Sequence, residues 1–237
     1  MIGNVNTVIY NNESDEIEIG LSPSNIDIAP LKQLETSLLP IFKSFFIFKD
    51  RVKLFSDVLI AFVKAIDLKD PYTKTHSEQV TKYAFFFGKK LNLDSSSLKM
   101  LTFAATLHDI GKISVKDAIL LKNGSLTLDE KEEVKKHVVR SYEIANEIES
   151  LKGAAEVIRH HHERYDGTGY PDGLKGEEIP YLSRILTIAD AFDAMTTDRP
   201  YRSALSINEA MEEILKNSGT QFDPALAKQF LKLKANI

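Results

Sequence analysis

Hydrophobic residues follow two different patterns along this chain, and the change falls near Pro30. Before it, apolar residues alternate with polar ones in "NTVIY" and "EIEIG" around an Asn/Ser/Asp turn, which predicts two short strands forming a hairpin. After it, apolar residues recur every three or four positions, the period of helices with one buried face. That spacing predicts helices over residues 31–48, 51–68, 74–91, 96–108, 129–149, 153–164, 181–196, 207–216 and 224–234.

Local signals mark where some of these elements begin. Ser95–Ser97 precede the apolar run "LKMLTFAATL", and Thr127 and Glu130 have the spacing of a capping box, so both segments are expected to open helices. The segment "HERYDGTGYPDGLKGEEIP" holds four glycines between two helical patterns, and we interpret it as a structured loop. The chain is therefore predicted to be all-α, with a short N-terminal hairpin.

Composition narrows the classes of function. The 237 residues are 43% hydrophobic and 27% charged, a balance typical of a globular domain, and a net charge of -4 argues against a DNA or RNA polymer as ligand. Because the chain has no cysteine, any metal would be held by His, Asp and Glu. We find no signal-peptide pattern and no unbroken apolar run of about 18 residues, so we expect a cytoplasmic protein without a membrane span.

The histidines carry the strongest chemical signal. All six lie between residues 76 and 162, at His76, His108, His137, His160, His161 and His162. Singly, each is most simply a packed or surface residue. His108–Asp109 and His161–His162 are adjacent pairs, and neighbours on a helix point about 100° apart, so each pair suits two close metal ions better than one. Two metals about 3.5 to 4 Å apart are the arrangement of phosphoester-cleaving sites.

Two aspartates extend this hypothesis. Asp109 has two oxygens and could bridge a pair of metals. Asp190 directly follows an apolar helical turn in "LTIADAF", where burial would penalise a carboxylate that is neither paired nor metal-bound. The alternative for Asp190 is a helix cap.

The motifs "DPYTKTHSEQV", "LHDIGK", "VKKHVVRSYEI", "RHHHERYDGTGYPDGLKGEEIP", "IADAFDAMTTDRPYR" and "GTQFDP", in this order and spacing, resemble the HD-GYP family of the HD-domain superfamily. The resemblance covers roughly four-fifths of the chain. It implies an HD-domain helical bundle, with residues 51–237 as the catalytic domain and residues 1–50 as an extension of hairpin and linker helix. It also implies hydrolysis of cyclic di-GMP to the linear dinucleotide or to GMP.

The resemblance also assigns roles to matching residues. It implies two divalent or mixed-valence metal ions, Fe or Mn, and contacts of the Gly-Tyr-Pro loop with diguanylate-cyclase (GGDEF) domains. The apolar segment from Leu31 to Phe48 could pair with its copy in a homodimer. His160 falls one place before the family's His pair and is left outside the site. The implied metal ligands are His76, His108, Asp109, His137, His161, His162 and Asp190; the catalytic residues are Asp109 and Lys112; the substrate contacts are Lys112, Asp193, Arg199 and Arg202; and the loop is Gly169, Tyr170 and Pro171.

The sequence departs from the family pattern beside the His-Asp pair. Residues 114–117 read "SVKD" and residues 122–124 read "KNG", which puts the fit of the substrate in question more than the metal ligands. Tyr72 stands where some members have a third-metal Glu, so two metals are favoured. Arg199 and Arg202 could instead form surface salt bridges. Two alternatives stay open: a metal-bound sensor or scaffold with weak catalysis, and a phosphodiesterase for another cyclic dinucleotide.

Overall fold

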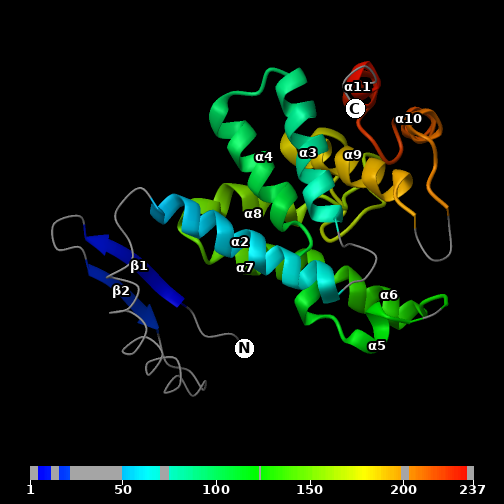
Figure 1. The fold of residues 1–237 in the computed structure, drawn as a ribbon. Coiled ribbons are helices and arrows are strands. Elements are labelled where there is room, and N and C mark those ends of the chain that lie inside the picture. Colours follow the sequence, from blue (N-terminus) through cyan, green and yellow to red (C-terminus); the bar gives the residue numbers. More distant parts are fainter. Residues whose placement is uncertain are drawn as a thin grey trace. The chain divides into compact units, whose positions relative to one another are not determined.

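The computed structural model of the chain describes residues 5–11, 16–21, 50–69, 75–122, 124–198 and 203–233 (Figure 1). The chain divides into two compact units, Met1–Val58 and Leu59–Ile237. The predicted helix from Leu31 to Phe48 lies outside the described residues, as do Tyr72, Arg199 and Arg202.

The first unit contains the predicted hairpin. Strand β1 (Val5–Asn11) pairs antiparallel with β2 (Glu16–Leu21), with Ile9 opposite Glu18 and Tyr10 opposite Ile17. The alternation of apolar and polar residues therefore predicted this element correctly. Helix α2 (Asp50–Lys69) follows and contributes residues to both units.

In the described residues of the second unit, the regular elements are all helices. Short 3-10 turns, labelled η, separate several of the α-helices and let the chain change direction sharply. The elements in order are α3 (His76–Lys90), α4 (Ser95–Leu107), η1 (Ile110–Ser114), α5 (Asp117–Leu120), α6 (Leu128–Lys135), α7 (His137–Asn146), η2 (Glu149–Leu151), α8 (Lys152–Arg159), η3 (Gly176–Glu178), α9 (Tyr181–Thr196), α10 (Ile207–Lys216), α11 (Pro224–Phe230) and η4 (Leu231–Leu233).

The core of this unit lies where α3 and α9 pack against their neighbours. Helix α3 contacts α4 and α9, α4 contacts α8, and α10 and α11 cover α9 (Figure 1). Phe230 sits edge-on to both Phe87 and Phe192, with ring centroids 5.0 and 5.2 Å away, and all three side chains are fully buried. Burial of each such ring stabilises the fold by about 1.5 to 3 kcal/mol.

A close approach of two backbones holds η1 against α7. A Cβ atom on Gly111 would lie 2.1 Å from the carbonyl oxygen of His137 and 2.5 Å from the amide nitrogen of Ser141, so only glycine fits. The Gly111 N–H donates to the Ser141 hydroxyl at 2.8 Å. This contact fixes His108 and Asp109, just before η1, next to the start of α7.

The structure corrects several predicted helix boundaries. Residues 129–149 were expected to form one helix, but α6 ends at Lys135 and α7 begins at His137, where the His137 ring bonds the Val134 carbonyl oxygen at 2.7 Å. The helix expected to reach residue 164 ends at Arg159. In contrast, α9 and α10 have the predicted bounds, and the Thr127 capping box is present. In the described part of the chain, no helix combines the length and apolar character needed to span a membrane.

Candidate metal centre

Seven side chains that are far apart in the sequence meet in the second unit. His76 and His137 are the first residues of α3 and α7, and Asp190 lies within α9. The other members lie in the turns that follow α4 and α8. Their potential ligand atoms form three overlapping groups, each with all atoms within 4.8 Å: His76, His108 and Asp190; His108, Asp109 and His161; and His137, His161 and His162.

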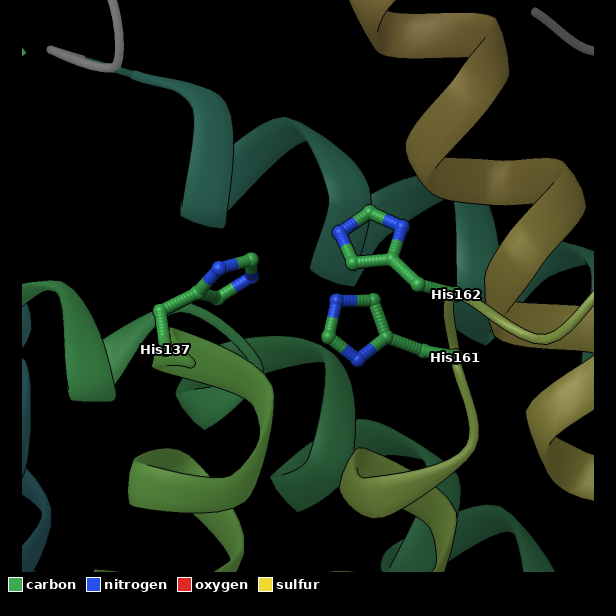
Figure 2. Close-up of side chains that lie close together, drawn as sticks. All are labelled: His137, His161 and His162. Atoms are coloured by element: carbon green, nitrogen blue, oxygen red, sulfur yellow. The ribbon is translucent and has the colours of Figure 1, made fainter. Parts of the chain in front are cut away.

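The two adjacent pairs do not behave as an ideal helix would predict. His161 and His162 both belong to one group with His137, and their ring centroids are 4.0 Å apart. Figure 2 shows the three rings converging from the start of α7 and from the turn after α8. Because α8 ends at Arg159, the pair lies in a turn and not on a helix, so the 100° separation expected of helical neighbours does not apply to it.

Three of the histidines are oriented by their own backbone. The Nδ1 atoms of His108, His137 and His161 lie 2.6 to 2.7 Å from the carbonyl oxygen three residues earlier. A carbonyl can only accept, so Nδ1 carries the proton and Nε2 keeps a lone pair for a metal. The Nε2 atoms of His137 and His161 are buried without a hydrogen-bond partner, which is costly unless a ligand is bound.

His76 is oriented by a carboxylate instead. Its Nδ1 lies 2.6 Å from Asp193, and its Nε2 lies 3.2 Å from Asp190. Burial would lower the pKa of His76, but the hydrogen bonds to the two aspartates raise it to about 10. His76 therefore carries a proton on both ring nitrogens near neutral pH when no metal is bound, and a metal ion must displace the proton on Nε2.

The remaining charges suit a cation bound among neutral imidazoles. Burial lowers the pKa of His137 and His161, and lowers that of His162 to about 4, so these rings are uncharged near neutral pH. Burial alone would raise the pKa of Asp109, but Lys112 and the nearby histidines hold it well below its usual range. Burial alone would also raise the pKa of Asp190, but the hydrogen bond with His76 lowers it. The donor set thus fits divalent metals with nitrogen and oxygen ligands.

Asp109 reaches both sides of the cluster. Its Oδ1 lies 3.2 Å from His137 Nε2, and its Oδ2 lies 3.5 and 3.8 Å from the Nε2 atoms of His108 and His76. Lys112 Nζ lies 2.8 Å from the same Oδ2. The carboxylate therefore has an oxygen facing each group of histidines, with one cation beside it.

The expected substrate contacts differ in whether they line a cleft. Lys112 lines a cleft of about 1140 Å³ together with five of the seven clustered side chains, as expected for a residue that meets a phosphate. Asp193 does not line this cleft: it is 2% exposed and faces His76. Its interpretation as a nucleotide contact is not supported by this position. Arg199 and Arg202 lie outside the described residues.

The Gly-Tyr-Pro loop closes one side of the cluster. The Tyr170 ring packs on His162 with centroids 5.1 Å apart, and a Cβ on Gly169 would lie 2.3 Å from the Arg164 amide nitrogen. Burial raises the pKa of Tyr170, so its hydroxyl stays protonated. The bond between Tyr170 and Pro171 is cis. The close approach of Gly169 to residues 163–164 thus keeps the Tyr170 ring against His162.

Sequence reasoning missed the residue that anchors this loop. Glu163 is 1% exposed, and its Oε1 accepts the N–H groups of Asp172 and Gly173 at 2.7 and 3.0 Å. The available signal was a carboxylate directly after a His pair and before a glycine-rich loop. His160, left outside the site, lies 3.1 Å from Asp172 and belongs to none of the metal-ligand groups.

Comparisons with known proteins agree with this arrangement. The model of the HD domain family matches residues 61–226. The chain is 41% identical over 167 residues to 3'3'-cGAMP-specific phosphodiesterase 3 of Vibrio cholerae, covering 70% of this chain and 36% of that protein. It is 40% identical over 173 residues to a cyclic di-GMP phosphodiesterase of Thermotoga maritima, covering 72% of this chain and 47% of that protein.

A further relative and two solved structures complete the comparison. The chain is 36% identical to the cyclic di-GMP phosphodiesterase response regulator RpfG of Xanthomonas campestris, covering 76% of this chain and 48% of that protein. It thus spans about half or less of the length of these relatives. A crystal structure of a cyclic GMP-AMP specific phosphodiesterase of V. cholerae aligns with TM-score 0.62 and 26% identity over 76% of this chain and 49% of that one. An HDG"Y"P protein from Bdellovibrio bacteriovorus shares the fold, with TM-score 0.56 and 14% identity over 100% of this chain and 96% of that one.

Proposed function

The chain belongs to the HD-domain family, and its His-Asp and Gly-Tyr-Pro motifs place it in the HD-GYP group; from this membership we propose that it is a metal-dependent phosphodiesterase. Its substrate is a cyclic dinucleotide that contains guanine, with cyclic di-GMP first and 3'3'-cGAMP second. The second substrate is included because a relative at 41% identity is named for it. The observation that carries the proposal is the cluster of seven potential ligand side chains, five of them buried, beside a cleft.

The cluster would hold two divalent ions, Fe or Mn. One group is His76, His108 and Asp190, the other is His137, His161 and His162, and Asp109 would bridge them. The ions would supply Lewis-acid activation of a water for attack on phosphorus. The donor set is borderline in softness and suits several first-row metals, so the identity of the ion depends also on its availability.

The chain's own groups then orient the substrate. Lys112 lines the cleft beside Asp109, where its ammonium group would offset negative charge on the phosphoryl oxygens. Asp109 stays ionised and is available as a ligand and as a proton acceptor. Asp193 holds the Nδ1 proton of His76 and so keeps Nε2 directed at the cluster. We assign Asp193 as a positioning residue and not as a substrate contact.

Four further proposals extend beyond the site. Residues 51–237 would form the catalytic domain, and the family match at 61–226 lies inside that range. The Gly-Tyr-Pro loop, which exposes Thr168, Asp172 and Gly173, would contact diguanylate-cyclase (GGDEF) domains. Homodimer formation through the N-terminal helices and a cytoplasmic location remain predictions that light scattering and cell fractionation can check.

The decisive experiment combines metal analysis with turnover. Wild-type protein purified without oxygen should contain bound metal and should convert cyclic di-GMP to a linear product. The double variant His108→Ala with Asp109→Ala should lose both metal and turnover, because it removes ligands from two of the three groups. His160→Ala is the matched control, since His160 belongs to none of them. Turnover retained by the double variant would refute the proposal, and binding without cleavage by the wild type would favour a sensor.

A further inference from the structure

A polar wall of the cleft lies on α10 and on the turn between α10 and α11. It consists of Glu213, Asn217 and Gln221, which line the same cleft as His76 and Asp109. We propose that this wall binds the hydrogen-bonding edge of a guanine base of the substrate. The inference rests on the proposed function and names the residues that determine its specificity.

The Asn217 amide has a fixed orientation. Its Nδ2 donates to the Glu213 carbonyl oxygen and to Glu213 Oε1, both at 2.9 Å. Both hydrogens are thereby used, and Oδ1 accepts from no described residue. Asn217 therefore presents an acceptor, and Glu213 places a carboxylate beside it.

Hydrogen bonds fix the backbone of Gln221, whereas its side-chain amide is available to a ligand. Its N–H donates to the Asn217 carbonyl oxygen at 3.0 Å, and its carbonyl oxygen accepts from the Tyr165 N–H at 3.3 Å. No described residue bonds its side-chain amide. An amide on a fixed backbone loses little entropy when it binds a ligand, which suits recognition.

The wall lies within reach of the metal centre. The bonds from Tyr165 and Asp166 to the carbonyl oxygens of Gln221 and Thr220 tie the turn to the segment that carries His162. Tyr165 is three residues from His162, so their Cα atoms are at most about 10 Å apart. The wall and the metal-ligand side chains line the same cleft, so a cyclic dinucleotide bound in it can place a phosphate at the metal centre and a base at the wall.

The chemistry of the wall favours guanine over adenine. Guanine presents N1–H and N2–H as neighbouring donors, which match the Glu213 carboxylate and Asn217 Oδ1, and its O6 can accept from the Gln221 amide. Adenine would place its N1 lone pair against an acceptor. Beside the wall, Phe222 and Met195 also line the cleft and offer apolar surface for the base.

The test compares cyclic di-GMP, cyclic di-IMP, which lacks the N2 amino group, and cyclic di-AMP. In the wild-type metal-loaded protein we expect affinity to fall in that order. In Asn217→Ala and Gln221→Ala, the ratio of kcat/KM for cyclic di-GMP to that for bis(p-nitrophenyl) phosphate, which has no purine, should fall about 10- to 100-fold. In Asn217→Ala the preference for cyclic di-GMP over cyclic di-IMP should shrink as well.

Gln229→Ala is the matched control, because Gln229 is exposed on α11 and does not line the cleft. Unchanged ratios in both variants, or equal affinity of the wild type for all three ligands, would overturn the inference. Calorimetry separates a failure of this inference from a failure of the proposed function. Tight binding of cyclic di-GMP without cleavage would refute the phosphodiesterase activity. The Kd values of the Asn217→Ala and Gln221→Ala variants would still show whether the wall binds guanine. Absence of any binding would overturn the inference too.

Discussion

The floor and the rim of the cleft differ in how firmly the structure holds their side chains. At the floor, His108, His137 and His161 are buried and fixed by hydrogen bonds to the backbone. At the rim, Lys131 lies in α6 and Lys122 follows α5, two short helices in which no residue is buried. The Lys122 ammonium group is held by the Glu130 carboxylate of α6, at 2.6 and 2.8 Å. This contrast separates a candidate metal centre that many contacts fix in place from a rim of more exposed side chains, which can vary without disturbing it.

The largest effect is expected from a residue that supports the floor without binding metal. Asp193→Asn removes the carboxylate that holds His76 and keeps its volume. Loss of such a partner typically costs 10- to 100-fold in metal affinity or activity. We expect that decrease in metal affinity, measured by competition with a chelator. Asp129→Asn is the control, since Asp129 is exposed at the start of α6; equal affinity in the two variants would contradict the assigned role.

A smaller effect is expected where the floor meets the Gly-Tyr-Pro loop. Glu163→Ala removes two backbone hydrogen bonds to a buried carboxylate, each worth about 1.5 to 3 kcal/mol, so the loop should open more often. We expect faster amide exchange at residues 169–173 and a KM for cyclic di-GMP raised roughly 10-fold, with metal content retained.

Glu163→Gln should restore much of this loss, because a side-chain carbonyl can still accept both N–H groups. Glu143→Ala, on the exposed face of α7, is the control. If bound metal decreases as KM rises, or if Glu163→Gln does not restore KM, then Glu163 contributes to general stability and does not position the loop.

The smallest effect is expected at the rim. Thr127→Ala removes the cap of α6, which costs about 1 kcal/mol of unfolding free energy and lowers Tm by roughly 2 to 4 °C in a domain of this size. Since α6 carries no metal ligand, kcat should change less than about twofold. Thermal unfolding followed by circular dichroism, together with initial rates, would check this, and a large fall in kcat would mean that rim and floor are coupled.

The sequence predicted those parts of the molecule that depend on local pattern. Helices α9 and α10 and the hairpin follow directly from spacing and alternation, and the motif resemblance singled out seven side chains that the structure brings close together. Long-range geometry was not predictable. The packing of Gly111 against the start of α7, the meeting of His161 and His162 with His137, and the pairing of Asp193 with His76 all depend on contacts between distant segments. The motif contains Gly111, but the sequence did not predict that its backbone packs against Ser141.

The most direct test of the central claim is the metal content of anaerobically purified protein. Inductively coupled plasma mass spectrometry should find about two ions of Fe or Mn per chain, and markedly fewer in a His161→Ala variant, because His161 belongs to two of the three ligand groups. Wild-type protein that binds no divalent metal, or a His161→Ala variant with the full complement, would contradict a metal centre at this site.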